Sequence, residues 1–562
     1  MAMGIKMDRT MPHKEDMLFR TGILFAFLAA VVLYGWNSDD AYHCYIMAKH
    51  LAEGKGLVYN TGYRTTAATC PLLAFFQAFV FLFTDSPDIC GILLGLLFSG
   101  AAAWILFFRF CSSTNMALGM LGLLVSSHCF MTFTTTGLEN SLLFFFGACF
   151  LDLYFRHSIL RAKHLFFLSL LMSLLAMARP DSVLVFIPMT VWAYLANAAP
   201  SFPRRIAIGL AGLLPFFAWT LFSVLYYGFP FPNTFYAKLY TGISRSVYVE
   251  YGLWYHVSSW LVDPTLLLVP LLFLLIVFRS RALKWIPLLL GMALYDLYLL
   301  TIGGDFMAGR HFTQLFFLSA CGIAMFFAEK GSCPSQDDPL HHSFETHTRI
   351  LLIAIFAIGF LWRGFVLPIV TKHIVNLDVA KTTKRSAVDE RAYYLKWDSR
   401  CATLQAIPAF FRNEDTREGL YHGTLPIVVS AHEQGAKGYC AEQFLMWGSM
   451  VWRCRDFNMF LTDTYALSDP LVARLEVDKS RNWRIGHASR DIPLGYRETL
   501  ASGENKIENN ALHEYYDKLL LVMTGKLFDR RRLKTILDLN LGRYQHLLQE
   551  YERDRKQRQE HK

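Results

Sequence analysis

Long apolar stretches constrain this chain most, because they recur through its first two-thirds. Eleven runs each approach the roughly 20 residues that an α-helix needs to cross a bilayer's hydrocarbon core. They lie near residues 21–36, 88–108, 115–131, 138–155, 164–178, 182–197, 206–226, 262–278, 285–302, 311–328 and 349–371. We therefore predict a polytopic α-helical membrane protein with about 11 transmembrane helices. A shorter run at 71–83 begins with proline, and we expect it to lie in the interface or to re-enter the membrane.

The composition agrees with a membrane protein and argues against a nucleic-acid-binding protein. The chain is 54% hydrophobic and 18% charged, a combination that soluble domains rarely show. Its net charge of +9 would suit nucleic acid, but in a membrane protein it indicates Lys and Arg held on the cytoplasmic side. We expect the lipid bilayer as a partner and no nucleic acid. The first 20 residues are mixed in charge, and no small-residue cleavage site follows, so the first run is expected to remain as a span.

The short loops orient the chain. With a cytoplasmic N-terminus, most inner loops are basic, as the positive-inside rule requires. The basic residues of these loops are Arg109, Arg156, Arg161, Lys163, Arg204, Arg205, Arg279, Arg281 and Lys284. The stretch 329–349 is an acidic exception, but acidic residues contribute little to the rule. The predicted outer segments are then 37–87, 132–137, 179–181, 227–261, 303–310 and 372–562.

The composition changes at about Lys372, which predicts two domains. Residues 1–371 form the membrane domain, with 37–87 as its first outer loop, and 372–562 form a C-terminal extracytoplasmic domain. A strand-like run at 425–430 and helical patterns at 509–523 and 527–553 predict an α/β fold for this domain. If it is exported, a disulfide between Cys440 and Cys454 is an option. No cysteine and histidine spacing indicates zinc.

Asp39 and Asp40 are the sharpest chemical signal, because they follow the first predicted span directly. Two adjacent carboxylates are costly to hold near lipid unless they bind or react. One of them could act as a general base on a sugar hydroxyl. The alternative is structural: Asp40 could cap a helix that starts at Ala41.

Other polar residues gather in the segments predicted to lie outside, or within two residues of them. They are Glu139, Arg179, Asp181, Asn233, Tyr236, Lys238, Asp305, Arg310 and His311. The outer cations could hold a phosphate, which arginine grips with paired donors. The alternative for these cations is snorkelling to lipid headgroups, or pairing with Asp181 and Asp305.

Several short motifs, in order, resemble one family. The stretch from Asp39-Asp40-Ala41-Tyr42 to Gly54-Lys55-Gly56-Leu57-Val58-Tyr59-Asn60 resembles the first outer loop of GT-C superfamily glycosyltransferases, and more narrowly of the AftB-type terminal arabinofuranosyltransferase family. Gly137-Leu138-Glu139, Arg179-Pro180-Asp181, Pro232-Asn233-Thr234-Phe235-Tyr236-Ala237-Lys238 and Gly303-Gly304-Asp305-Phe306-Met307 are similar to later motifs of that family. The segment Asp463-Thr464-Tyr465 to Leu475 resembles its C-terminal part.

The resemblance implies a GT-C-like fold and a glycosyltransferase that uses a polyprenyl-phosphate-linked sugar and a glycan acceptor. It implies that Asp39 or Asp40 is the catalytic carboxylate. It implies donor-phosphate binding by Arg179, Lys238, Arg310 and His311. It implies substrate binding by Tyr42, Asn60, Glu139, Asp181, Asn233, Tyr236 and Asp305. Residues 63–71 depart from the family pattern, so a pentose other than arabinofuranose, or a hexose, stays open.

The residues leave two mechanistic options and two other functions open. The acid pair could divide into a base and an orienting group, or it could bind a divalent cation such as Mg or Ca. A lipid-linked sugar transporter would bury ionisable residues in mid-span, and such residues are sparse here. A glycan-binding or assembly protein without catalysis would not require the acid pair. The gathering of polar residues on one predicted face favours the enzyme, in a bacterial inner membrane with the C-terminal domain in the periplasm.

Overall fold

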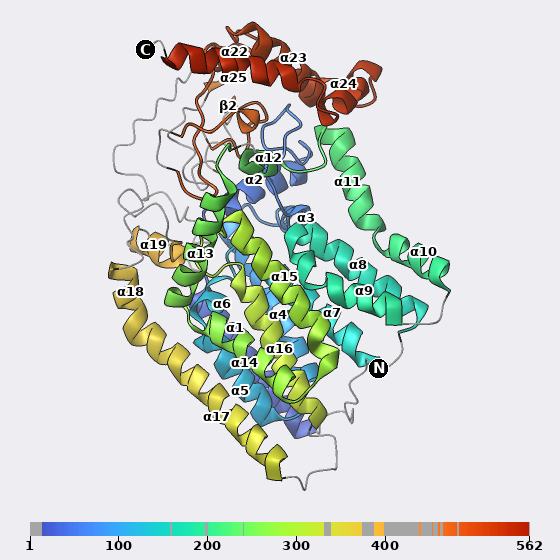
Figure 1. Ribbon diagram of the computed structural model, residues 1–562, viewed down its shortest axis with the longest axis vertical. Coiled ribbons are helices and arrows are strands. Elements are labelled where there is room, and N and C mark those ends of the chain that lie inside the picture. The colour runs from blue at the N-terminus through green and yellow to red at the C-terminus, as the bar shows by residue number, and fades with distance from the viewer. Residues whose placement is uncertain are drawn as a thin grey trace. The chain divides into compact units, whose positions relative to one another are not determined.

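The computed structural model is mainly helical in the part of the chain that it describes (Figure 1). The described residues are 14–157, 160–196, 201–239, 241–330, 339–373, 387–397, 438–439, 452, 459–460, 465–479 and 483–560. The chain divides into two compact units, each assembled from three stretches of sequence. Unit 1 comprises Met1–Ser38, Asp88–Phe216 and Arg245–Leu420; unit 2 comprises Asp39–Pro87, Phe217–Ser244 and Tyr421–Lys562.

Unit 1 holds most of the apolar helices. They are α1 (Lys14–Tyr34), α4 (Pro87–Ile105), η1 (Leu106–Phe110), α5 (Thr114–Ser126), α6 (His128–Thr132), α7 (Asn140–Arg156), α8 (Ala162–Ala178), η2 (Pro180–Val185), α9 (Ile187–Ala196), α10 (Phe202–Gly212), α13 (Arg245–Val262), α14 (Thr265–Arg279), η3 (Leu283–Trp285), α15 (Ile286–Ile302), α16 (Phe312–Lys330), α17 (Pro339–Leu361), η4 (Trp362–Val366), α18 (Leu367–His373) and α19 (Glu390–Trp397). Helix α11 (Leu214–Tyr227) begins at the end of this unit. Each of the eleven predicted apolar runs contains a helix.

Five described helices are long and apolar enough to cross a membrane, or up to seven if each of two bent pairs counts as one span. This confirms a polytopic helical architecture, while the count of eleven remains a prediction. Several predicted spans are shorter as helices because polar residues interrupt them. The run at 115–131, for example, breaks at Ser127, whose side chain accepts a hydrogen bond from the backbone of Phe130 and so starts a new helix.

One long helix lies where the sequence predicted only an outer loop. Helix α13 occupies the second half of 227–261 and meets α14 at an angle of 97°. The bend falls at Asp263 and Pro264. The buried Asp263 carboxylate accepts hydrogen bonds from Ser127 Oγ at 2.6 Å and Cys129 N at 2.9 Å, so the bend is tied to the start of α6. Sequence reasoning missed α13 because its polar residues interrupt the apolar run.

Small residues allow close helix packing inside unit 1. A Cβ on Gly291 of α15 would lie 1.8 Å from the carbonyl oxygen of Val185, and one on Gly252 of α13 would lie 2.2 Å from that of Leu300. Neither position could hold a larger residue without moving the neighbouring backbone. Such contacts are typical of helices that pack in a membrane.

Unit 2 combines the first loop, the segment after α11 and the C-terminal segment. Its further elements are α2 (Ala41–Ala52), α3 (Pro71–Val80), α12 (Asn233–Leu239), β1 (Gly438–Tyr439), β2 (Met459–Phe460), η7 (Val472–Arg474), α22 (Tyr496–Ser502), α23 (Asn510–Thr524), α24 (Arg530–Asn540) and α25 (Gln545–Glu560). A buried cluster joins Tyr63 and Ala237 to residues of η7 and α23, including Val472 and Leu512. The three stretches therefore share one hydrophobic core.

The predicted α/β character of the C-terminal segment is not supported. Its described part is helical apart from β1 and β2, which pair in parallel over two residues each. The helix at 509–523 is confirmed as α23. The helix at 527–553 divides into α24 and α25, because Gly542 adopts a left-handed backbone between them. The run at 425–430 and both Cys440 and Cys454 lie outside the described residues.

Two arginines, the buried Arg532 and the half-buried Arg64, bind helix ends within unit 2. Arg532 donates to the carbonyls of Leu225 and Tyr226, both at 2.8 Å, and to that of Val522 at 2.9 Å. These carbonyls end α11 and α23, where the helix dipole favours a cation. Arg64 of the first loop likewise donates to the carbonyls of Val522 and Gly525. The first loop and the C-terminal helices are thus joined by charge-assisted hydrogen bonds.

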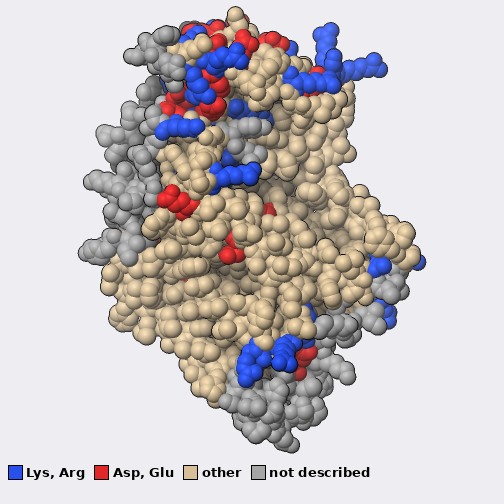
Figure 2. Space-filling view, in the orientation of Figure 1, with Lys and Arg blue, Asp and Glu red and all other residues tan. Residues whose placement is uncertain are grey.

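The surface charges differ between the parts. On the face in Figure 2, the helices of unit 1 show mostly uncharged residues, as a lipid-facing surface would. Lys, Arg, Asp and Glu gather instead over the C-terminal helices α22 to α25. Exposed apolar side chains such as Phe25, Leu97, Leu275 and Phe365 fit the same lipid-facing interpretation.

Candidate functional site

A buried group of charged residues lies in unit 1, and the sequence predicted every one of its members. They come from the segment before α7, the α8–η2 connection and the α15–α16 connection. We call the group the Glu139 cluster, and it consists of Glu139, Arg179, Asp181, Asp305, Arg310 and His311.

Two arginines converge on one carboxylate at the centre of this cluster. Arg310 Nη2 donates to Glu139 Oε1 at 2.9 Å and to Oε2 at 3.1 Å. Arg179 Nη1 donates to the same Oε1. The side chain of Glu139 is only 2% exposed. Burial alone would raise the pKa of this carboxyl, but the adjacent charges of Arg310 and Arg179 lower it to about 2.

Two more carboxylates form salt bridges with these arginines. Arg179 Nε lies 2.8 Å from Asp181 Oδ1, and Arg310 Nη1 lies 3.2 Å from Asp305 Oδ2. Three carboxylates thus face two guanidiniums, and the cluster carries one formal negative charge when His311 is neutral. Both predicted phosphate-binding arginines are paired with carboxylates, so a phosphate would have to take the place of a carboxylate oxygen.

His311 completes the cluster. Its Nδ1 lies 2.9 Å from the hydroxyl of Tyr295, and its Nε2 lies 3.3 Å from both Asp305 Oδ2 and Arg179 Nη2. Burial lowers the pKa of His311, and the charge of Arg179 lowers it further, although Asp305 opposes the change. His311 is therefore neutral near pH 7, so one of its ring nitrogens donates a hydrogen bond and the other accepts one.

Glycines position the α15–α16 connection. Gly304 and Gly309 have φ angles of +69° and +75°, which side chains rarely adopt. A Cβ on Gly304 would lie 2.2 Å from the ring of Tyr255, and one on Gly309 would lie 2.5 Å from the Cys129 sulfur. The tight loop presses against α13 and α6, and this packing holds Asp305 and Arg310 toward Glu139.

The acid pair that the sequence singled out lies in unit 2, directly before α2. Asp39 is buried and Asp40 is half-buried. The backbone of Asp40 precedes the helix, but its side chain makes no capping hydrogen bond to α2. Asp40 therefore occupies the N-cap position of α2 without a side-chain capping hydrogen bond. Tyr42 is fully buried against the rings of Tyr45 and Trp452.

The remaining predicted residues also belong to unit 2. Asn60 is buried in a turn, where its carbonyl accepts a hydrogen bond from Tyr63 N at 3.1 Å. Asn233 donates to the carbonyls of Ala466 at 2.8 Å and Asp469 at 2.9 Å, which fixes η7 beside α12. Lys238 is exposed on α12.

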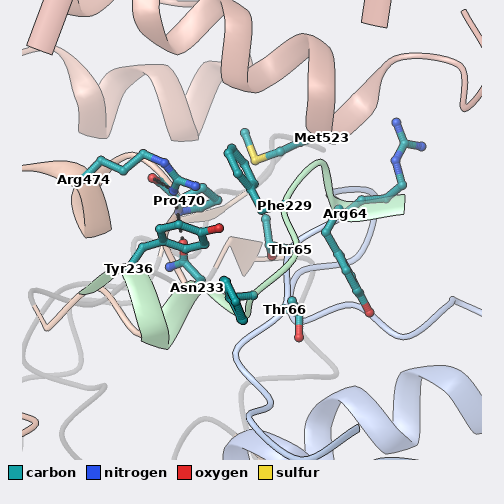
Figure 3. Close-up of a pocket in the computed structure, with 11 residues that line it drawn as sticks. Arg64, Thr65, Thr66, Phe229, Asn233, Tyr236, Pro470, Arg474 and Met523 are labelled. Carbon is teal, nitrogen blue, oxygen red and sulfur yellow. Dashed lines mark hydrogen bonds between the residues drawn. The ribbon is translucent and has the colours of Figure 1, made fainter. Parts of the chain in front are cut away.

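A pocket in unit 2 lies beside Asn233 and Tyr236 (Figure 3). It holds about 300 Å³ of empty space, part of which is open to solvent. Its lining residues are Arg64, Thr65, Thr66, Tyr227, Phe229, Phe231, Asn233, Tyr236, Pro470, Arg474 and Met523. Aromatic rings, two arginines and two threonines make up most of this lining, and no carboxylate is among them.

Sequence reasoning missed a second buried network in unit 1. The hydroxyl of Tyr34 hydrogen bonds to Nδ1 of His128, whose Nε2 lies 2.8 Å from Asp389 Oδ2. The guanidiniums of Arg363 and Arg391 lie 4.0 and 3.8 Å from the centre of the Tyr34 ring. Burial would raise the pKa of Asp389, but His128 beside it gives a net lowering. The only signal in the sequence was the charged triplet at 389–391, shortly after the last apolar run.

The segment 389–391 also forms hydrogen bonds to the residues around the start of the first loop. Ser38 Oγ donates to Glu390 Oε2 at 3.0 Å, and Ser38 N donates to the carbonyl of Thr136. Arg391 Nε donates to the carbonyl of Tyr34 at 2.9 Å. These bonds fix the backbone immediately before Asp39.

In the described part of the chain, no group of three or more His, Cys, Asp or Glu residues has an arrangement that could hold a metal ion. Binding of Mg or Ca by the acid pair stays a prediction. Comparison with known proteins adds no family assignment: no protein-family model, curated protein or solved structure matches this chain.

Proposed function

We propose that this chain is a membrane glycosyltransferase of the GT-C type. It moves a sugar from a polyprenyl-phosphate donor to a cell-envelope glycan on the outer face of a bacterial inner membrane, and arabinofuranose is the first sugar to test. In this proposal the chain crosses the membrane about eleven times, with its N-terminus in the cytoplasm and residues 372–562 outside.

One observation carries the proposal: six residues predicted from sequence to bind substrate or phosphate converge in the Glu139 cluster. Three separate connections supply them; Glu139, Arg310 and His311 are buried, and the other three are half-buried. Burying so many charges costs solvation free energy, and a hydrophobic core of the same volume would often be as stable. A cluster of this kind, at the ends of apolar helices, is therefore a candidate for function.

The chemistry of the proposal requires a base and a departing phosphate. Asp39 or Asp40 accepts the proton of an acceptor hydroxyl. At the same time the oxygen of that hydroxyl bonds to the anomeric carbon of the donor. The bond between that carbon and the phosphate oxygen breaks, and the polyprenyl phosphate leaves with the bonding electron pair.

The roles of the cations follow from their surroundings. A phosphate at Arg179 or Arg310 would compete with Glu139, Asp181 and Asp305 for the guanidinium donors. Lys238 is exposed and could approach a phosphate without such competition. The neutral His311 can exchange a hydrogen bond with a sugar hydroxyl or a phosphate oxygen.

The test is sugar transfer by purified protein in detergent. The variants are Asp39→Asn, Asp40→Asn and the double variant, with Glu508→Gln as a control that removes an exposed carboxylate of unit 2. Each is assayed with a panel of polyprenyl-phosphate sugars and an oligosaccharide acceptor. We expect one single variant to lose roughly 10²-fold or more in rate while it remains folded, as for removal of a general base. The control should keep wild-type activity.

The outcomes separate the alternatives. If folded wild-type protein transfers no sugar from any donor of the panel, the enzymatic proposal is contradicted. Binding of the glycan without transfer would then favour an assembly factor. If wild type is active and all three Asp variants keep that activity, the base must be sought among Glu139, Asp181 and Asp305.

A further inference from the structure

The pocket of unit 2 contains a buried cation that the described residues leave incompletely hydrogen-bonded. Arg474 is 9% exposed, and its guanidinium lies 4.0 Å from the centre of the Phe229 ring and 4.7 Å from that of Tyr236 (Figure 3). Nη1 donates to the carbonyl of Pro470 at 2.6 Å and to Asn233 Oδ1 at 3.4 Å. Nη2 is buried and has no hydrogen-bond partner in the described part of the chain.

The position of this guanidinium is fixed before any ligand arrives. Asn233, which accepts from Nη1, is itself held by two carbonyls of the segment that leads into η7. The two aromatic rings restrict the guanidinium plane further, and their cation–π attraction offsets part of its desolvation. Within the described residues no carboxylate forms a salt bridge with Arg474, unlike Arg179 and Arg310 in unit 1.

A second unused polar atom lines the same pocket. Thr65 is 3% exposed, and its Oγ1 is buried without a partner among the described residues. Its backbone is fixed, because Thr65 N donates to the carbonyl of Tyr63 and its own carbonyl accepts from Tyr59. Buried polar groups are nearly always hydrogen-bonded, so the unused donors of Arg474 and Thr65 call for an acceptor from outside the described residues.

Arg64 also lines the pocket, but its guanidinium is bonded elsewhere. Its guanidinium extends away from Arg474 in Figure 3 and donates to the carbonyls at the end of α23. It lines the pocket without binding across it. Phe231 and Met523 give the pocket apolar walls. The site therefore combines one desolvated cation and one hydroxyl with apolar and aromatic surface.

We infer that this pocket binds an anionic group, a phosphate or a carboxylate, carried by a ring or a hydrocarbon chain. Arg474 Nη2 and Thr65 Oγ1 donate to its oxygens, and Phe231 and Met523 contact its apolar part. The bound anion neutralises a guanidinium that the described residues leave without a carboxylate partner. This binding goes beyond the proposed function, because it does not require that the chain transfer sugars.

The test measures binding of small probes to the full-length protein in detergent by calorimetry. Phenyl phosphate, farnesyl phosphate, glucuronate and the neutral phenyl glucoside differ in the anion and in the group that carries it. We expect at least one of the anionic probes to bind and the neutral one to bind at least about tenfold more weakly, since a hydrogen bond to a charged group contributes about that factor or more. Tight binding of farnesyl phosphate alone would identify a lipid source, and binding of glucuronate alone would identify an acidic sugar.

Three variants assign the binding to these residues. Arg474→Gln should weaken binding by about tenfold or more. Thr65→Val keeps the shape of Thr65 and should weaken it by several-fold, which covers the case that Arg474→Gln does not fold. Arg530→Gln removes the same charge from an exposed position of unit 2 and should leave affinity unchanged. The inference is overturned if no anionic probe binds, if the neutral probe binds equally well, or if folded Arg474→Gln or Thr65→Val binds as wild type does.

Discussion

Arg310 Nη2 donates hydrogen bonds to both carboxylate oxygens of Glu139, at 2.9 and 3.1 Å, although the two residues are 171 positions apart. Glu139 also accepts from Arg179, so one buried carboxylate joins three connections of unit 1. This arrangement makes the pair a structural centre as well as a candidate substrate site, and the two roles can be separated by experiment.

The Glu139–Arg310 pair is expected to be energetically coupled. Glu139→Gln and Arg310→Gln should each lower the free energy of unfolding by about 3–5 kcal/mol, because each leaves a buried charge without its partner. The double variant should lose clearly less than the sum of the two single losses. Denaturant unfolding in detergent measures the four proteins of the cycle.

Arg204→Gln is the matched control for this cycle, because Arg204 is exposed on α10. It should change the stability by no more than about 0.5 kcal/mol. Strictly additive losses in the Glu139–Arg310 cycle would show that the two side chains do not stabilise one another.

Stability should depend on acid pH through Glu139. The pKa of its carboxyl lies at about 2 in the folded protein, below its ordinary value of 4.5. Between these values the unfolded chain binds a proton that the folded chain does not, so stability rises with pH. The contribution of Glu139 is complete above about pH 4.5 and is lost as pH falls toward 2.

Unfolding measured at steps of pH should therefore show a weaker loss on acidification in Glu139→Gln than in wild type. Asp389, whose pKa is also lowered, remains in both proteins and contributes equally to both curves. Glu508→Gln, which changes an exposed carboxylate, should follow the wild-type curve. Identical slopes for wild type and Glu139→Gln would contradict the assigned pKa.

Gly228 is expected to be essential for the packing of unit 2. Its φ angle is +88°, and an added Cβ would lie 2.2 Å from Val522 Cγ1 of α23. Gly228→Ala should cost about 1–2 kcal/mol for the left-handed backbone and a further 1–3 kcal/mol for overpacking. The thermal unfolding temperature measures the sum.

Two further variants separate these contributions. Gly503→Ala has a similar φ angle of +76° with no atom within 4 Å, so it should show the backbone cost alone. Adding Val522→Ala to Gly228→Ala should remove the steric overlap and recover part of the loss. If Gly228→Ala is no less stable than Gly503→Ala, the contact with α23 does not constrain this position.

Much of the secondary structure could be predicted from local sequence. Apolar runs of membrane length gave helices at every predicted position, and the amphipathic pattern at 509–523 gave α23. Breaks inside these runs were harder to foresee. The bend at Asp263 depends on hydrogen bonds to Ser127 and Cys129, more than 130 residues away.

Some features of the candidate site likewise follow from the sequence, and others follow only from the fold. The sequence by itself determined which polar residues are unusual, since Glu139, Arg179 and Arg310 stand out against apolar surroundings whatever the fold. Only the tertiary structure decided that these residues pair with one another and that the Asp40 side chain makes no capping hydrogen bond to α2. It also decided that Arg474 Nη2 has no hydrogen-bond partner among the described residues. The physical reason is that charge and hydropathy are properties of each residue, whereas pairing and desolvation depend on which distant segments the folded chain brings together.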